Sequence, residues 1–173
     1  MPGAEDRLRD ALRTRGLTPF VGTGLSMAAT NNAECAGWRG LLKSGIKACE
    51  DAIPGLAAGW GDRERQKLQN GELDDFLDIG DGISRRLQRT GTGRDFDSWI
   101  QSTVGTLAPS DHGRELISEV RKLGKIVATT NYDTLIEDAD PEWRSYTWND
   151  EEFAGALQDS CVVLHLHGSC GSP

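Results

Sequence analysis

Apolar residues gather in three short runs, and helix-like spacing fills most of the chain between them. The runs cover residues 17–21, 125–130 and 161–166. Short apolar runs of this kind are typical of buried strands in parallel sheets. The stretches between them place apolar residues every three or four positions, which predicts helices. Strands that alternate with helices predict an α/β fold in which helices cover both faces of a parallel sheet.

The helical stretches differ in character along the chain. Residues 5–15 predict a short amphipathic helix with Leu8 and Leu12 on one face. Residues 56–107 predict a helical insertion that several glycines break into pieces. The insertion carries a group of acids, which we interpret as a solvated face rather than a metal site: Asp74, Asp75 and Asp78. Ser110 or Asp111 is expected to cap a further helix.

A polar motif follows each of the three apolar runs. The motifs are Gly22-Thr23-Gly24-Leu25-Ser26, Thr130-Asn131-Tyr132-Asp133 and His165-Leu166-His167-Gly168-Ser169. In open parallel sheets, ligands bind outside the carboxyl ends of the strands. The three motifs are therefore expected to share one edge of the sheet, where a ligand would bind.

The first motif has the composition of a phosphate-binding turn. Glycines between a strand and a helix let backbone N–H groups approach phosphate oxygens, and Ser26 adds a hydroxyl donor. The motif departs from the full dinucleotide fingerprint, since Met27 stands at its third glycine position and no acid follows about 20 residues later. A tight turn without a ligand is the alternative.

The second and third motifs also allow two interpretations each. Asn131 can exchange hydrogen bonds with ribose hydroxyls or water, and Asp133 can accept from a carboxamide or stabilise a cation; the alternative is a turn that caps the next helix. His165 and His167 would share one strand face. Such a pair can bind zinc, but nothing nearby in the sequence completes a site, so no metal is predicted. A histidine at a strand end is well placed as a base, or it is structural.

Composition and charge narrow the classes of function. The net charge of −8 argues against nucleic-acid binding by charge, although Arg85, Arg86 and Arg89 form a small basic cluster. No apolar run approaches the roughly 20 residues of a membrane span, and the N-terminus lacks a signal-peptide core, so a cytoplasmic location is expected. The four cysteines form no C-x-x-C pair and are interpreted as reduced thiols.

In this order, Gly-x-Gly-x-Ser, Thr-x-Asn-x-Asp and His-Gly resemble the Sir2 family over about residues 17–169. Tyr132 stands where the family's deacylases usually carry an aliphatic residue. The segment Gly37-Trp38-Arg39-Gly40-Leu41-Leu42 is similar to a helix start of bacterial Sir2-like proteins. The resemblance implies a Rossmann-like sheet.

The resemblance also implies a site and an activity. NAD would be bound as the substrate by the first motif, and Thr130 and Tyr132 would be among the binding residues. Asn131 would hold ribose and water, Asp133 would meet the nicotinamide end, and His167 would act as base or ribose contact. The implied catalytic residues are therefore His167, Asn131 and Asp133, and the implied binding residues are Gly22, Thr23, Gly24, Ser26, Thr130, Asn131, Tyr132, Asp133 and His167. Bacterial relatives of this kind are mostly NAD glycohydrolases of anti-phage defence.

The chain departs from the deacylating members of the family. The four-cysteine zinc module that follows the His-Gly motif in those enzymes is missing here, which argues against a deacylase. We expect one Sir2-like domain over residues 1–173, belonging to a longer protein or completed by a partner. Expected partners are NAD and either a second copy or further sensor domains, without membrane or direct nucleic-acid binding. A non-catalytic module that binds NAD or ADP-ribose, or serves assembly, is the alternative.

Overall fold

The chain divides into two compact units in a computed structural model that describes residues 3–90, 95–159 and 161–170. The first, the sheet unit, combines residues 1–32 with residues 107–173. The second, the helical unit, is formed by residues 33–106. Each unit has its own buried core.

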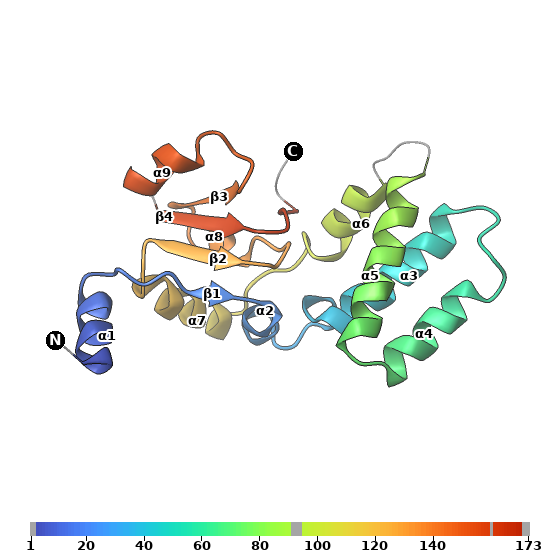
Figure 1. Cartoon of the computed structure of the whole chain (residues 1–173), viewed down its shortest axis with the longest axis horizontal. Helices are drawn as coiled ribbons and strands as arrows, with labels where there is room; N and C mark the ends of the chain where they lie inside the picture. Colours follow the sequence, from blue (N-terminus) through green and yellow to red (C-terminus); the bar gives the residue numbers. More distant parts are fainter. Residues whose placement is uncertain (1–2, 91–94, 160, 171–173) are drawn as a thin grey trace. The chain divides into compact units, whose positions relative to one another are not determined.

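The sheet unit contains a four-stranded, all-parallel sheet in the order β1-β2-β4-β3 (Figure 1). Its strands are β1 (Phe20–Val21), β2 (Ile126–Thr129), β3 (Trp143–Thr147) and β4 (Cys161–His165). The runs 125–130 and 161–166 are thus confirmed as largely buried strands, whereas the run 17–21 forms only a two-residue edge strand in which Phe20 is 65% exposed. The strands end level with one another, because Thr129 pairs with both Val21 and His165, and His165 also pairs with Thr147.

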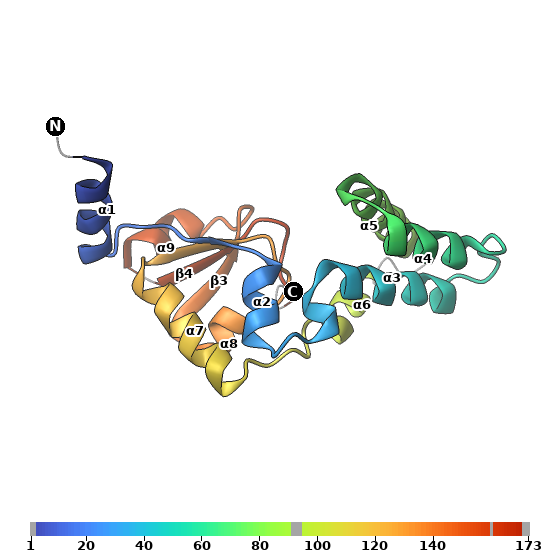
Figure 2. The ribbon, with the colours of Figure 1, turned by 90° about the horizontal axis from the view of Figure 1, so that it is seen from below.

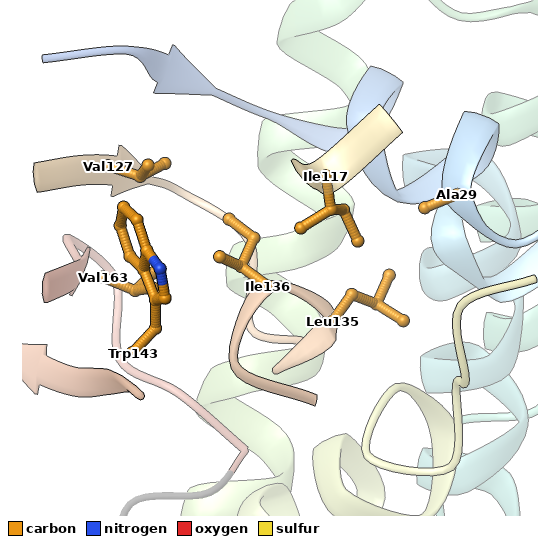
Figure 3. Close-up of a cluster of buried hydrophobic side chains, with 7 residues drawn as sticks. All are labelled: Ala29, Ile117, Val127, Leu135, Ile136, Trp143 and Val163. Atoms are coloured by element: carbon orange, nitrogen blue, oxygen red, sulfur yellow. The ribbon is translucent and has the colours of Figure 1, made fainter. Parts of the chain in front are cut away.

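Helices cover both faces of the sheet, as expected. On one face lie α2 (Thr23–Ala29), α7 (Asp111–Lys122) and α8 (Leu135–Ala139), while α9 (Phe153–Asp159) lies on the other (Figure 2). The first face is joined to its helices by a cluster of buried side chains that includes Ala29, Ile117, Val127, Leu135, Ile136, Trp143 and Val163 (Figure 3). On the opposite face, the ring of Tyr146 lies 6.2 Å from that of Phe153 of α9.

The packing of α2 against α7 explains one glycine and one cap. A Cβ atom at Gly113 would lie 2.1 Å from the carbonyl oxygen of Ala29, so the two helices approach too closely for any side chain there. Ser110 caps α7 by accepting from Gly113 N at 3.0 Å, and its hydroxyl donates to Ala29 O at 3.1 Å. Of the two expected caps, Ser110 is therefore the one used.

The helix expected near the N-terminus is confirmed as α1 (Ala4–Arg13). None of its residues is buried. Leu8 and Leu12 share its apolar face and remain 51% and 40% exposed. Sequence periodicity marks which face of a helix is apolar, but it does not say what covers that face.

The helical unit begins earlier than the segment 56–107 expected from the sequence. It contains η1 (Glu34–Ala36), α3 (Trp38–Ala52), α4 (Trp60–Asn70), α5 (Leu73–Gln88) and α6 (Asp95–Thr103). Its buried residues include Leu42, Ile46, Cys49, Ile79, Ile83, Leu87 and Trp99. The boundary moves because the apolar face of α3 packs on α5 rather than on the sheet: a Cβ at Gly45 of α3 would lie 2.9 Å from Ile83.

Three further expectations from the sequence can be compared with the structure. Asp74 and Asp78 are exposed on α5 as expected for a solvated face, whereas Asp75 is only partly exposed and accepts from Glu72 N at the start of the helix. Cys35, Cys49, Cys161 and Cys170 are all free thiols. Among the helices that the structure describes, none combines the length and the apolar character needed to cross a membrane.

Candidate functional site

The level strand ends bring the three polar motifs to one edge of the sheet. The first motif follows Val21, the second follows Thr129, and the third begins at His165, and these residues share one row of the sheet. The expected meeting of the motifs is therefore confirmed at the level of the backbone.

The first motif forms the start of a helix rather than the expected turn between a strand and a helix. Gly22 is the N-cap of α2, and the helix already begins at Thr23. Ala29, at the far end of this helix, is anchored in the core of the sheet unit. Tertiary packing therefore outweighs the weak helix propensity of the glycine at position 24.

Neither glycine of this motif is required by packing. A Cβ at Gly24 would have no neighbour within 4 Å, and one at Gly22 would meet Thr130 Oγ1 at an ordinary 3.8 Å. Gly22 has an extended φ of −138°, which any residue adopts. Glycine inside a helix costs about 0.5–1 kcal/mol relative to alanine. The folded chain thus gives no reason for these glycines, whereas a ligand that approaches the backbone closely would give one.

A chain of hydrogen bonds joins the first motif to the second. The amide Nδ2 of Asn131 donates to Ser26 Oγ at 2.7 Å, and Ser26 Oγ donates to Asp133 Oδ2 at 2.6 Å. Because the single hydroxyl hydrogen of Ser26 goes to the carboxylate, Ser26 must accept from the amide. This order fixes which end of the Asn131 side chain is oxygen.

The side-chain oxygen of Asn131, Oδ1, is the most informative atom of the site. Asn131 is 8% exposed, and its Oδ1 is buried without a hydrogen-bond partner among the described residues. A buried acceptor without a donor costs about 1–3 kcal/mol. A hydrogen-bond donor from water or a ligand would satisfy this acceptor, and the same holds for the buried Oε2 of Glu137, which also lacks a partner among the described residues.

Asp133 serves both interpretations of the second motif. Its Oδ1 accepts from Leu135 N at the start of α8, at a long 3.4 Å, which is the expected turn. Its Oδ2 is bound by Ser26. Burial raises the pKa of Asp133, and the hydrogen bonds from Ser26 and from the Leu135 backbone oppose that rise. A half-buried carboxylate of this kind is suited to stabilise a nearby cation.

The two histidines of the third motif do not share a face. β4 ends at His165, and His167 lies beyond the strand with an exposed side chain. The expectation that the strand alternation extends to both is wrong, because the backbone bends at Leu166 and Gly168 adopts φ +95°. Over residues 3–90, 95–159 and 161–170, no group of three or more His, Cys, Asp or Glu residues is arranged to hold a metal ion.

The segment that carries His167 is nevertheless fixed beside the second motif. Leu166 N donates to Thr129 O at 2.9 Å, and Cys170 N donates to Tyr132 O at 2.7 Å. The backbone from Leu166 to Cys170 therefore runs along residues 129–132. Tyr132 is half-buried there, and burial raises the pKa of its hydroxyl.

Sequence reasoning missed one residue of this region, Glu137. From α8, its Oε1 lies 2.8 Å from Nε2 of the fully buried His165, and Nδ1 of that ring lies 3.0 Å from Asn131 O. Burial lowers the pKa of His165, but the hydrogen bond and charge of Glu137, the Asn131 carbonyl and the charge of Asp133 together outweigh it, so the pKa is raised. In the sequence, nothing distinguishes Glu137 from its neighbour Asp138.

Comparison with known proteins matches part of the chain to one family. The family model described as a SIR2-like domain matches residues 125–173, which contain the second and third motifs but not the first. No significant match was found among curated proteins or among solved structures. Residues 125–173 are therefore similar to a SIR2-like domain, and they belong to an α/β fold with a parallel sheet.

Proposed function

We propose that the sheet unit binds NAD at the carboxyl edge of its sheet and hydrolyses the bond between nicotinamide and ribose. The observation that carries the proposal is the hydrogen-bonded set of Ser26, Asn131 and Asp133, which leaves the buried Oδ1 of Asn131 without a donor. The SIR2-like match of residues 125–173 supports NAD as the substrate. The unpacked glycines at positions 22 and 24 support a place for its phosphates.

The chemistry requires little from the protein. Nicotinamide in NAD is already cationic, so it leaves as a neutral molecule when the electron pair of the C–N bond passes to the ring nitrogen. The ribose then carries positive charge, which the Asp133 carboxylate stabilises. Water attacks that carbon, and its proton passes to His167 or to solvent. The products are nicotinamide and ADP-ribose.

In this scheme Asn131 and His167 have distinct tasks. The Oδ1 of Asn131 accepts a hydrogen bond from a ribose hydroxyl or from the attacking water, which fixes its direction. His167, exposed and held on the segment beside residues 129–132, acts as base or ribose contact. Thr23, Thr130 and Tyr132 complete the proposed binding site.

A release assay tests the proposal directly. The full chain is incubated with NAD, and free nicotinamide is measured by chromatography. We expect release that falls at least a hundredfold in Asn131→Ala and His167→Ala, in line with the usual contribution of such groups. His112→Ala is the matched control, because His112 is exposed on α7 and Asn131 lies on a different element. The hydrolase proposal would be refuted if the wild-type chain released no nicotinamide at high protein concentration, either by itself or as part of a longer parent protein.

A second candidate function is a module that binds NAD or ADP-ribose without cleaving it. It is favoured by the fact that, in the described part of the chain, His167 makes no hydrogen bond, while the Ser26–Asn131–Asp133 set is complete without it. Calorimetry with NAD distinguishes the two. Binding without nicotinamide release supports the module, and binding that survives Asn131→Ala refutes the site for both functions.

We further propose that NAD hydrolysis by this chain serves anti-phage defence, acting together with a second copy or a sensor domain. This proposal rests on the similarity of the three motifs to bacterial Sir2-like proteins. Infected bacteria that express the chain should lose NAD, whereas those that express Asn131→Ala should retain it. Equal NAD levels in the two cultures would refute the role, and light scattering of the purified chain reports whether it self-associates.

A further inference from the structure

His165 occupies the last position of β4, where its ring lies between α8 and the loop after β2. Its two nitrogens face two acceptors, the carbonyl oxygen of Asn131 and the carboxylate of Glu137. A carbonyl oxygen has no hydrogen to donate, so Nδ1 carries a proton. Nε2 carries one as well when Glu137 is ionised. The ring is then an imidazolium that bridges a backbone carbonyl and a carboxylate.

We propose that His165 is a positioning residue of the NAD site: paired with Glu137, its imidazolium holds the backbone carbonyl of Asn131 and thereby aims the Asn131 side chain. The inference rests on the proposed function and deepens it, because it explains how Asn131 Oδ1, a buried acceptor without a partner among the described residues, is oriented. His165 itself touches no substrate in this scheme.

The contacts of Asn131 show why a single backbone hydrogen bond matters. Its N–H donates to Thr129 Oγ1 at 3.0 Å, its carbonyl accepts from His165, and its Nδ2 donates to Ser26. Both backbone groups and one end of the side chain are thus held, and only Oδ1 is free. Loss of the His165 bond releases the carbonyl and lets the residue rotate, so Oδ1 no longer points in one direction.

The pair also makes the positioning depend on pH. The charged groups that act on His165 are Glu137 on α8 and Asp133 in the loop, and together with the Asn131 carbonyl they raise its pKa despite burial. A raised pKa means that the stabilisation is fully present below the ordinary value of about 6.5 and is lost as pH rises through the pKa of the folded state. At higher pH the Glu137 carboxylate faces a bare nitrogen.

Two replacements of Glu137 distinguish the effect of its charge from the effect of its hydrogen bond to His165. In Glu137→Gln the amide can donate to Nε2, so a neutral His165 still donates Nδ1–H to Asn131. In Glu137→Ala neither partner remains for Nε2. We therefore expect Glu137→Gln to retain most of the affinity that Glu137→Ala loses, and to lose the pH dependence.

The first test needs no NAD. Imidazole nitrogen NMR of the full chain, followed over pH, should show that His165 keeps protons on both nitrogens to a higher pH than it does in Glu137→Gln, where Nδ1 alone is expected to carry a proton. The side-chain amide signals of Asn131 should shift in His165→Phe and stay in place in His112→Gln, an exposed histidine of α7. A wild-type ring that loses its second proton at the same pH as in Glu137→Gln, or unshifted Asn131 signals in a folded His165→Phe variant, would overturn the inference.

The second test measures affinity for ADP-ribose, a probe that is not consumed. His165→Phe should weaken binding about tenfold or more, as expected for the loss of a charge-assisted hydrogen bond. Wild-type affinity should fall as pH rises through the raised pKa of His165, and Glu137→Gln should show no such fall. A wild type that does not bind ADP-ribose contradicts the proposed function, while the NMR result still decides the role of His165. If His165→Phe does not fold, the two Glu137 variants decide it: equal affinities and equal pH profiles overturn the inference.

Discussion

Removal of the Ser26 hydroxyl is the sharpest perturbation of the candidate site. Ser26 is 2% exposed, and its one oxygen links Asn131 to Asp133. In Ser26→Ala the buried amide of Asn131 loses its acceptor, and the Asp133 carboxylate loses its strongest donor. The shape of the helix is unchanged, since alanine fits any helical position that serine fits.

The magnitude follows from these two losses. A buried amide without a partner costs about 1–3 kcal/mol, and the lost bond to a carboxylate costs about 1.5–3 kcal/mol. Asp133 is only half-buried, so water recovers part of its share. Alanine's higher helix propensity returns up to about 0.5 kcal/mol. We expect the sheet unit to lose about 2–4 kcal/mol of unfolding free energy at pH 8.

The pH dependence gives a second readout. Burial raises the pKa of Asp133 above its ordinary value of 3.8, so stability is fully present below that value and falls as pH rises through the pKa of the folded protein. Ser26 opposes the rise of this pKa. Without Ser26 the pKa rises further, and the loss of stability between acidic and neutral pH becomes larger.

The assay is hydrogen exchange of the β2 amides under native conditions, with urea unfolding in parallel. Hydrogen exchange reports on the sheet unit by itself, which is needed because the two units need not unfold together. Ser118→Ala is the matched control, since Ser118 lies on α7 and makes no hydrogen bond among the described residues. A Ser26→Ala variant as stable as Ser118→Ala, or with a smaller loss at pH 8 than at pH 4, would refute the reasoning.

Four further outcomes are expected. Asp133→Asn removes the carboxylate whose pKa is raised by burial, so it should abolish nicotinamide release while unfolding free energy at pH 8 changes by less than about 1 kcal/mol. Gly24→Ala should stabilise the ligand-free chain by about 0.5–1 kcal/mol but weaken ADP-ribose binding. Gly113→Ala should cost at least about 1–3 kcal/mol, because its Cβ would collide with Ala29 O. Cys49 should resist iodoacetamide at pH 8 in the native chain, because burial raises its pKa to about 11.

Each of these outcomes has a result that contradicts it. Gly155→Ala, at a site with no neighbour within 4 Å, is the control for both glycine variants in urea unfolding. A Gly24→Ala chain that binds ADP-ribose normally removes the argument for close ligand approach at α2. Full activity of Asp133→Asn removes the cation-stabilising role. Peptide mapping that finds Cys49 alkylated as fast as in urea contradicts its burial.

Local pattern was enough to predict the strands and the edge at which the motifs meet. The runs that became β2 and β4 could be identified because buried parallel strands are continuous in apolar character, whereas β1 is a short edge strand with an exposed Phe20. Ser110 marked a helix start through backbone chemistry that acts within four residues. The start of the helical unit could not be identified in this way, because the apolar face of α3 fits a sheet as well as it fits α5.

The roles of individual side chains depended on contacts between distant parts of the chain. Ser26 meets Asn131 across 105 residues, and His165 meets Glu137 across 28. In the sequence, His165 and His167 look equivalent. In the structure, His165 is buried and lies within hydrogen-bond distance of the Asn131 carbonyl, whereas His167 is exposed.

The α/β class could be predicted from the periodicity of apolar residues. The meeting of the three motifs at the sheet edge could be predicted from the rule that parallel strands end together. Only the tertiary structure decided which polar atoms are satisfied. Hydrogen bonding is directional and short-ranged, so the free Oδ1 of Asn131 and the pairing of His165 with Glu137 exist only once the helices have packed on the sheet.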